Sequence, residues 1–147
     1  MARNKCFVET SVFIRFYTKD HEDKYKDCLQ LFKLIESGKI TPRTSNIVIQ
    51  EIIYILTRHY KFPVNEVLSD VRTVFKLRNI KVIEKTDTLK AINLFEKFKI
   101  KLGDAFIATQ IPKGVTLVTY DKDFKKIKGL NVATPGEIVK QFNISLN

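Results

Sequence analysis

The stretch KLGDAFIATQIPKGVTLVTYDKDF, from Lys101 to Phe124, decides the fold predicted for this chain, because it joins a short apolar helix to a buried strand. Asp104 opens the apolar run AFIATQI, whose members three, four and seven positions further on share its helical face. Asp121 directly follows the β-branched run 115–120, so we expect it at the carboxyl end of a buried strand. Ligand crevices form at that end of open parallel α/β sheets.

The length of 147 residues and the 44% hydrophobic content predict one domain, residues 1–147, with one core. No run of about 18 apolar residues exists, and MARNK leads into only a short apolar segment. We therefore expect no membrane span and no signal peptide, and a cytoplasmic protein. Cys6 and Cys28 have the spacing of neither a zinc site nor a disulfide framework, so we expect buried thiols.

The chain carries a formal charge of +10, from 26 basic and 16 acidic residues. Such an excess favours polyanionic partners through the release of counterions. A Lys-rich composition with one Met and no Trp also suits the ion-paired surface of a thermophile's protein. Both interpretations of the charge stay open at this point.

Strand and helix patterns alternate along the chain, joined by short connections. Strands are predicted at 5–9, 39–43, 80–83, 115–120 and 131–133. Helices are predicted at 12–17, 20–37, 46–60, 63–75, after Asp87 or Thr88, at 104–111 and at 136–142. In the helix 63–75, the residues in register on one face are Val64, Val67, Leu68, Val71 and Phe75. In the helix after Asp87 or Thr88, the residues expected to point inward are Leu89, Ile92 and Phe95. This alternation predicts an α/β fold with a mostly parallel sheet of four to five strands and helices on both faces.

Four acids, Glu9, Glu51, Asp104 and Asp121, are candidates for one site, because three of them fall at ends of elements that a parallel sheet gathers at one edge. Converging carboxylates repel one another unless protons or a hard cation neutralise them. Mg²⁺ or Mn²⁺ suits such oxygen ligands and leaves positions for phosphate oxygens and water. Metal-activated water aimed at a phosphodiester is the chemistry of a nuclease.

Each acid also has a plain structural interpretation. Asp104 can cap its helix, and Asp121 can cap the turn that begins at Lys122. Glu51 can belong to a solvated polar stripe on its helix. For Glu9, a plain structural role and a role in the site are equally well supported by the sequence. Asp123 can be an outer ligand or a surface partner of Lys126, and its local sequence favours the surface partner. The local sequence of His21 and His59 suits surface or capping positions.

Four blocks of this chain together resemble a PIN domain, in particular the VapC-type toxins of prokaryotic toxin-antitoxin pairs. The blocks are VETSVFIRFYTKD (8–20), the helix around Glu51, LGDAFIAT (102–109) and LVTYDKDF (117–124), and the resemblance covers nearly the whole chain. It implies a three-layer α/β/α fold around a parallel sheet. It also implies an acidic quartet that holds one or two Mg²⁺ or Mn²⁺ ions and hydrolyses RNA.

Carried over block by block, the catalytic and metal-binding quartet falls on Glu9, Glu51, Asp104 and Asp121, with Thr119 or Ser11 as hydroxyl support and Asp123 as an auxiliary acid. One position departs from the family, which has aspartate where this chain has Glu9. The extra methylene moves the carboxylate outward by about 1.5 Å. This change suits an active natural variant, a weakened homologue or an engineered change, and we predict that Glu9→Asp raises metal-dependent cleavage if the site is merely misplaced.

The resemblance also implies partners: an RNA substrate, a small antitoxin and a second copy in a homodimer. Phe13, Phe16, Tyr17 and Tyr54 suit either an interface or the core. Lys125, Lys126 and Lys128 are candidate contacts to RNA phosphates, or parts of a solvated basic turn. The main alternative function is a PIN-like domain that binds RNA or protein without cleaving. A receiver-like signalling domain fits poorly because Glu9 has no acidic neighbour, and a purely structural role is the remaining alternative.

Overall fold

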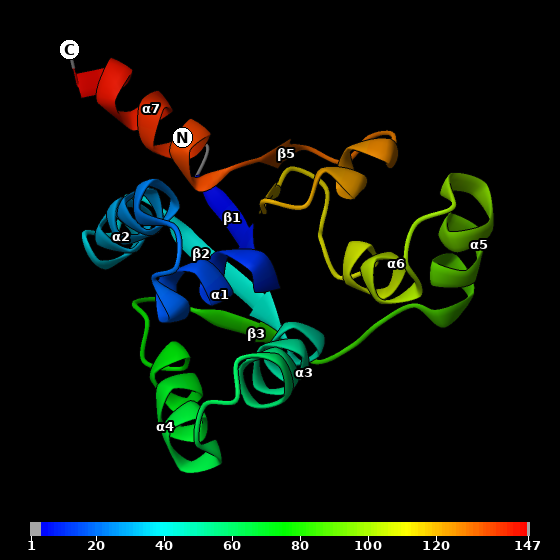
Figure 1. Ribbon diagram of the computed structural model, residues 1–147. Coiled ribbons are helices and arrows are strands. Elements are labelled where there is room, and N and C mark those ends of the chain that lie inside the picture. The colour runs from blue at the N-terminus through cyan, green and yellow to red at the C-terminus, as the bar shows by residue number, and fades with distance from the viewer. Residues whose placement is uncertain (1–3, 147) are drawn as a thin grey trace.

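A computed structural model describes residues 4–146 as an α/β fold built on a five-stranded sheet (Figure 1). The strands run parallel in the order β3-β2-β1-β4-β5. They are β1 Lys5–Val8, β2 Thr41–Ser45, β3 Lys81–Ile83, β4 Thr116–Val118 and β5 Val132–Ala133. The predicted fold class is confirmed, and β1 lies at the centre of the sheet, where parallel strands are buried on both faces.

Seven α-helices, a π-helix and a 3₁₀-helix connect or flank the strands in the described part of the chain. They are α1 Thr10–Thr18, α2 Glu22–Glu36, α3 Asn46–Tyr54, the π-helix Ile55–His59, α4 Val64–Val74, α5 Thr88–Phe98, α6 Leu102–Ala108, the 3₁₀-helix Lys122–Lys126 and α7 Pro135–Leu146. The helix predicted to run through Tyr60 therefore ends in a π-helical turn. His21 caps α2 by accepting a hydrogen bond from the Lys24 amide, as its position near a helix start predicted.

The buried core joins the central strands to the helices around them. Phe7 and Val8 of β1 are inaccessible to solvent, as are Leu31 and Ile35 of α2. The predicted buried thiols are confirmed, since Cys6 and Cys28 are both free and buried. Phe13 is core, Phe16 and Tyr17 pack partly buried against it, and Tyr54 is exposed, which divides the four residues that suited either an interface or the core.

The prediction for α5 is wrong in its direction. Leu89, Ile92 and Phe95 are 76%, 41% and 43% exposed, although the pattern predicted that they point inward. The helix instead buries Ala91 and packs Leu94 and Phe98 against the core. Both sets have helical spacing, and the small Ala91 allows α5 to approach α6 closely, so the bulkier set is left outside.

Helix α4 shows the same effect at its ends. Val67 and Val71 are buried as predicted, but Val64 and Phe75 are 56% and 52% exposed. Both exposed residues lie at the limits of the helix, where no neighbouring element covers the stripe. No helix in the described residues is both long and apolar enough to cross a membrane.

Candidate metal centre

The candidate site lies where β1 and β4 end side by side. The two strands pair in parallel with Val8 opposite Val118, and the Glu9 amide donates to the Val118 carbonyl at 3.0 Å. Parallel pairing brings the residues that follow each strand to one edge of the sheet. Glu9 follows β1, and Asp121 follows β4 after two further residues. The structure therefore places both acids at the edge where the sequence predicted them.

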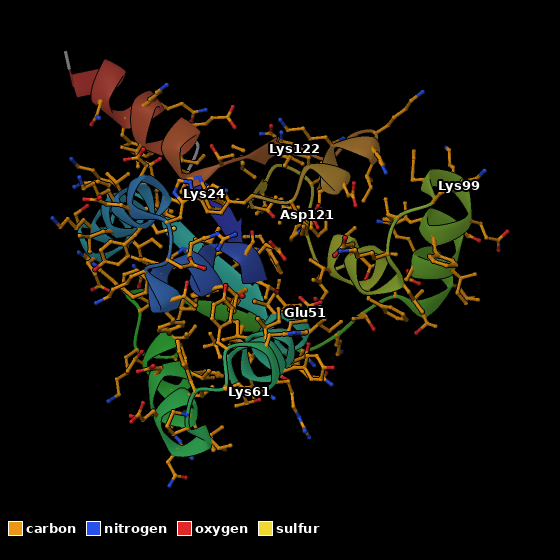
Figure 2. All side chains as sticks on the ribbon, in the orientation of Figure 1. Lys24, Glu51, Lys61, Lys99, Asp121 and Lys122 are labelled. Carbon is orange, nitrogen blue, oxygen red and sulfur yellow. The ribbon has the colours of Figure 1, made fainter. Side chains whose placement is uncertain are left out.

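Helices α3 and α6 bring the other two acids to the same cavity. Glu9, Glu51, Asp104 and Asp121 all line a cavity of about 290 Å³, which we call the acidic pocket. Figure 2 labels Glu51 and Asp121, which come from α3 and from the segment after β4. These acids are separated by up to 112 positions in sequence, so only the fold brings them together.

Three aspartates form the tightest group of acids. Asp104, Asp121 and Asp123 each offer a carboxylate oxygen within 4.8 Å of those of the other two. Within the described residues, Glu9 and Glu51 line the pocket without joining such a group. Asp123 also lies 3.3 Å from Lys126 Nζ, so it forms the surface ion pair that the sequence favoured, while its role as an outer ligand stays a prediction.

The capping interpretation holds for one aspartate and fails for another. Asp121 Oδ1 accepts a hydrogen bond from the Asp123 amide at 2.9 Å, which caps the 3₁₀-helix. Asp104 caps nothing, because it is the third residue of α6 and Lys101 occupies the cap position. Its side chain is therefore not explained by the helix end. Asp121, by contrast, serves the turn and the pocket with the same carboxylate.

Glu9 is held by three donors on one oxygen. Its Oε1 accepts from the Ser11 amide at 3.0 Å, the Ser11 hydroxyl at 2.7 Å and the Thr119 hydroxyl at 2.6 Å. Glu9 thereby acts as the N-cap of α1, which begins at Thr10 and so two residues earlier than the predicted helix. Its Oε2 has no hydrogen-bond donor among the described residues. One oxygen therefore fixes the side chain, and the other is left for a ligand.

The two hydroxyls also orient the backbone that carries Asp121. Ser11 Oγ accepts from the Tyr120 amide at 2.9 Å, and Thr119 Oγ1 accepts from the Asp121 amide at 2.9 Å. Each hydroxyl donates to Glu9 and accepts from the chain after β4. The predicted support residues therefore lie in direct contact with Glu9, and they connect it to the neighbourhood of Asp121.

Glu51 is fixed by α1 and crowded by α6. The Thr10 hydroxyl donates a hydrogen bond to Glu51 Oε1, a contact for which the local sequence gave no signal. A Cβ atom on Gly103 would lie 3.3 Å from Glu51 Oε2, so a glycine suits this close approach. Burial raises the pKa of Glu51, against the lowering effect of the Thr10 hydrogen bond, and the charge of Glu9 raises it further. Glu51 is thus part of the pocket and not of a solvated stripe.

The Asp104 side chain is buried in the acidic pocket without a hydrogen-bond donor, among the residues that the structure describes, for one of its oxygens. Its side chain is only 6% exposed, and its Oδ2 is buried with no hydrogen-bond partner in the described residues. Burial first, and then the charges of Asp121, Glu9 and Glu51, together raise its pKa from 3.8 to about 7, against the lowering effect of Lys101. An orphaned buried oxygen among carboxylates is satisfied by a hard divalent cation. The residues present therefore fit Mg²⁺ or Mn²⁺, which take oxygen ligands of this kind.

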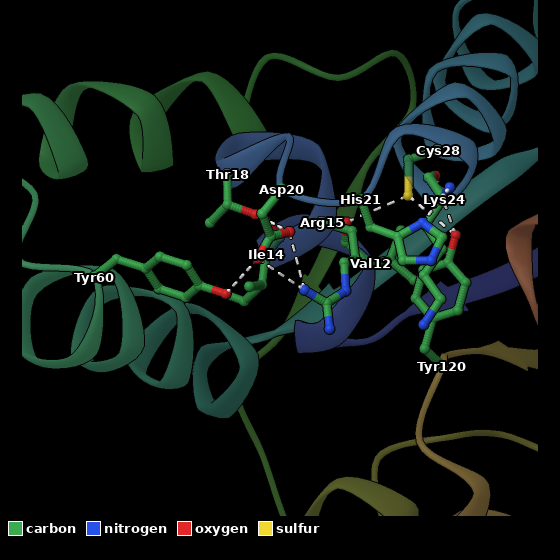
Figure 3. Close-up of polar contacts among 10 residues, drawn as sticks. All are labelled: Val12, Ile14, Arg15, Thr18, Asp20, His21, Lys24, Cys28, Tyr60 and Tyr120. Atoms are coloured by element: carbon green, nitrogen blue, oxygen red, sulfur yellow. Dashed lines mark hydrogen bonds and ion pairs between the residues drawn. The ribbon is translucent and has the colours of Figure 1, made fainter.

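Two cations whose place in the site the local sequence did not indicate also line the acidic pocket, Lys101 and Arg15. Arg15 Nη1 donates to both oxygens of Asp20 at 3.0 and 3.1 Å, and Tyr60 and Thr18 donate to the same carboxylate (Figure 3). No other atom of the guanidinium has a hydrogen-bond partner among the described residues. The only advance signal was helical spacing, since Arg15 lies four residues after Ser11.

The structure separates the three lysines predicted to contact RNA. Lys125 lines a cavity beside Asp121, Lys126 pairs with Asp123, and Lys128 lines a different cavity with Lys90 and Lys113. A run of neighbouring lysines in sequence thus reaches three different surroundings. Only Lys125 borders a cavity that contains one of the four acids of the acidic pocket.

Residues 6–130 match the family model of the PIN domain, and the chain belongs to this family. The solved structures that share its fold include VapBC toxin-antitoxin proteins. One is VapBC2 from Rickettsia felis bound to a DNA fragment from their promoter, with 22% identity and a TM-score of 0.65 over 88% of this chain and 98% of that chain.

Two further structures support the same fold. A protein of Pyrobaculum aerophilum is 16% identical with a TM-score of 0.63, over 98% of this chain and 92% of that chain. VapBC-1 from nontypeable Haemophilus influenzae is 15% identical with a TM-score of 0.63, over 89% of this chain and 98% of that chain. No curated protein matches the sequence significantly. At these identities the likeness establishes the fold.

Proposed function

We propose that this protein is a Mg²⁺- or Mn²⁺-dependent endoribonuclease, the toxin component of a type II toxin-antitoxin pair. The observation that carries the proposal is Asp104 Oδ2, which is buried without a partner among the acids of the pocket. A metal ion would satisfy this oxygen and offset the mutual repulsion of the carboxylates. Membership of the PIN domain family supports the same chemistry, since these domains are typically metal-dependent nucleases.

Asp104, Asp121 and Asp123 would hold the metal, and Glu51 and the Oε2 atom of Glu9 would complete the acidic surroundings. A bound Mg²⁺ or Mn²⁺ supplies an activated water and stabilises negative charge on the phosphodiester. The side chains have separate tasks around it. Thr119 and Ser11 keep Glu9 and the chain before Asp121 in place, and Lys101 and Arg15 offer positive charge to RNA phosphates at the pocket.

The proposal includes an antitoxin partner and a homodimer. Two of the structures that share this fold are described as VapBC proteins, which supports an antitoxin as partner. The exposed apolar residues of α5, with Leu102 at the start of α6, offer a surface for a protein partner. A small protein that covers the acidic pocket would prevent RNA from reaching it.

A second candidate function is RNA or protein binding without cleavage. It is favoured by Glu9, whose Oε1 is fully engaged by three donors, so that only Oε2 remains for the metal. A carboxylate displaced by about 1 Å can cost on the order of 100-fold in rate. This candidate predicts intact metal binding with no turnover.

The test is cleavage of a labelled, mostly unstructured RNA with Mn²⁺, with Mg²⁺ and with a chelator, beside Asp104→Asn prepared in the same way. We expect metal-dependent cleavage by the wild type and a loss of at least about 100-fold in the variant, because a metal ligand contributes several kcal/mol to the transition state. Equal cleavage by both proteins would contradict the proposal. Metal binding by an inactive wild type would favour the second candidate function.

A further inference from the structure

A second cavity, of about 390 Å³, adjoins the acidic pocket and shares Tyr120 and Asp121 with it. Its charged lining has three lysines, Lys24 from α2 and Lys122 and Lys125 from the 3₁₀-helix, against two aspartates, Asp27 and the shared Asp121. We call it the basic cavity. Figure 2 labels Lys24, Asp121 and Lys122, which lie in the same part of the molecule. A cavity lined by cations therefore lies directly beside the one lined by carboxylates.

Tyr120 holds Lys24 at the boundary between the two cavities. The Lys24 ammonium lies 4.9 Å from the centre of the Tyr120 ring, and the Tyr120 hydroxyl donates to the Lys24 carbonyl at 3.2 Å (Figure 3). Burial raises the pKa of Tyr120, so the phenol keeps its proton and remains a donor at neutral pH. One tyrosine thus positions both the backbone and the charged end of Lys24.

The positive charges of the basic cavity are not neutralised by ion pairs. Among the described residues, Lys24, Lys122 and Lys125 form none. The acid in the lining apart from Asp121 is Asp27, and its Oδ2 would lie 2.6 Å from a Cβ on Gly136. The Asp27 carboxylate therefore lies against the start of α7, where a helix N-terminus favours negative charge. The three ammonium groups remain available to a ligand.

We propose that the basic cavity binds the phosphate next to the scissile one on a single strand of RNA, with Lys24 and Lys122 as its principal contacts. The inference rests on the proposed nuclease function. An RNA strand whose reacting phosphate lies against Asp121 meets the basic cavity on the other side of the same residue. Lysines are point-charge binders of phosphate, and single-strand sites combine such charges with aromatic side chains.

The test compares Lys24→Gln/Lys122→Gln with Lys90→Gln/Lys113→Gln, which removes the same charge from another cavity. Binding of a labelled single-stranded RNA is measured with Ca²⁺ between 50 and 300 mM KCl. Loss of the one phosphate bound in this cavity lowers the slope of log K against log salt by about 0.7, the value for one neutralised phosphate on a single strand. We expect this change, with binding weakened about tenfold at low salt, and wild-type behaviour in the control.

The outcomes separate this inference from the proposed function. If the wild type cleaves RNA with Mn²⁺ but the Lys24/Lys122 variant keeps the wild-type affinity and slope, the basic cavity is not a phosphate site. If the wild type neither binds nor cleaves RNA, the proposed function and the inference fall together. The variant Lys24→Arg/Lys122→Arg keeps both charges and is expected to restore binding; a failure to do so at an unchanged melting temperature would overturn the assignment.

Discussion

The acidic pocket and the basic cavity share Asp121 and Tyr120, yet they hold their charges in opposite ways. Glu9 and Asp104 are 5% and 6% exposed and are fixed by secondary structure and hydrogen bonds. Lys122 and Lys125 are exposed side chains on a short 3₁₀-helix. Like charges that water surrounds cost little, whereas like charges buried together raise the free energy of the fold. The acidic pocket therefore stores an unfavourable energy that a cation can release, and the basic cavity does not.

This contrast depends on the hydroxyls between β1 and β4. Thr119 is 2% exposed, and its hydroxyl contacts both Glu9 and the Asp121 amide. Thr119 thus holds the acids in position by hydrogen bonds and adds no charge to the basic cavity. A change at this residue should therefore distinguish geometry from charge.

After Asp104→Asn, the largest effect is expected for Thr119→Val, which keeps the side-chain shape but removes one donor to Glu9 and the acceptor of the Asp121 amide. Metal-dependent cleavage should fall by about 10- to 100-fold, as for other groups that orient metal ligands. RNA binding with Ca²⁺ should change much less, because the lysines are untouched. Thr116→Val is the matched control, because Thr116 begins β4 and its hydroxyl, among the described residues, is hydrogen-bonded only to Asn131. Equal cleavage rates in the two variants would show that the hydroxyl has no positioning role.

A smaller effect, in the opposite direction, is expected for Glu9→Asp. The shorter side chain can still cap α1 through the Ser11 amide, while its carboxylate returns toward the position that the family's aspartate occupies. Cleavage should rise by roughly tenfold, a part of what a 1 Å misplacement can cost. Glu51→Asp makes the same shortening at another acid and should lower the rate. Unchanged cleavage in Glu9→Asp would mean that Glu9 is not misplaced.

The smallest effect concerns pH and stability without metal. The pKa of Asp104 is raised by burial and by neighbouring acids from 3.8 to about 7, so the folded state binds more protons than the unfolded state between these values. Its contribution to stability is present at low pH and is lost as pH rises from about 4 to 7. The melting temperature in chelator should therefore fall over this window by a few degrees more in the wild type than in Asp104→Asn.

The difference in melting temperature between the wild type and Asp104→Asn isolates the effect of the Asp104 carboxyl group. Asp20 and Glu137 have lowered pKa values, through hydrogen bonds from Thr18 and from the Thr134 backbone respectively, and they act in the opposite direction at lower pH. Both are present in wild type and variant, so their effect cancels in the difference. Identical pH profiles would show that Asp104 is not under electrostatic strain. Adding Mn²⁺ should remove the difference in slope by stabilising the ionised carboxylates.

The sequence alone was sufficient for the parallel α/β class and for the acids at the ends of β1 and β4. The β-branched run before Asp121 and the apolar run before Glu9 define the strands locally, and parallel pairing then requires that their carboxyl ends meet. The strand boundaries moved by at most two residues. Glu9 left its strand because its side chain caps α1, a competition between strand and cap that the pattern does not resolve.

Only the tertiary structure decided which face of α5 is buried. It also decided which of Lys125, Lys126 and Lys128 borders the site. The positions of Thr10 and Arg15 at the acidic pocket likewise depend on the tertiary structure. Helical and strand periods record which residues share a face, but they do not record what that face meets. Contacts such as Thr10 with Glu51, 41 positions apart, depend on how α1 and α3 pack. The sequence therefore predicted that acids lie at the ends of the strands. Their hydrogen-bond partners and their raised pKa values depend on distances that only the packing of the helices and strands sets.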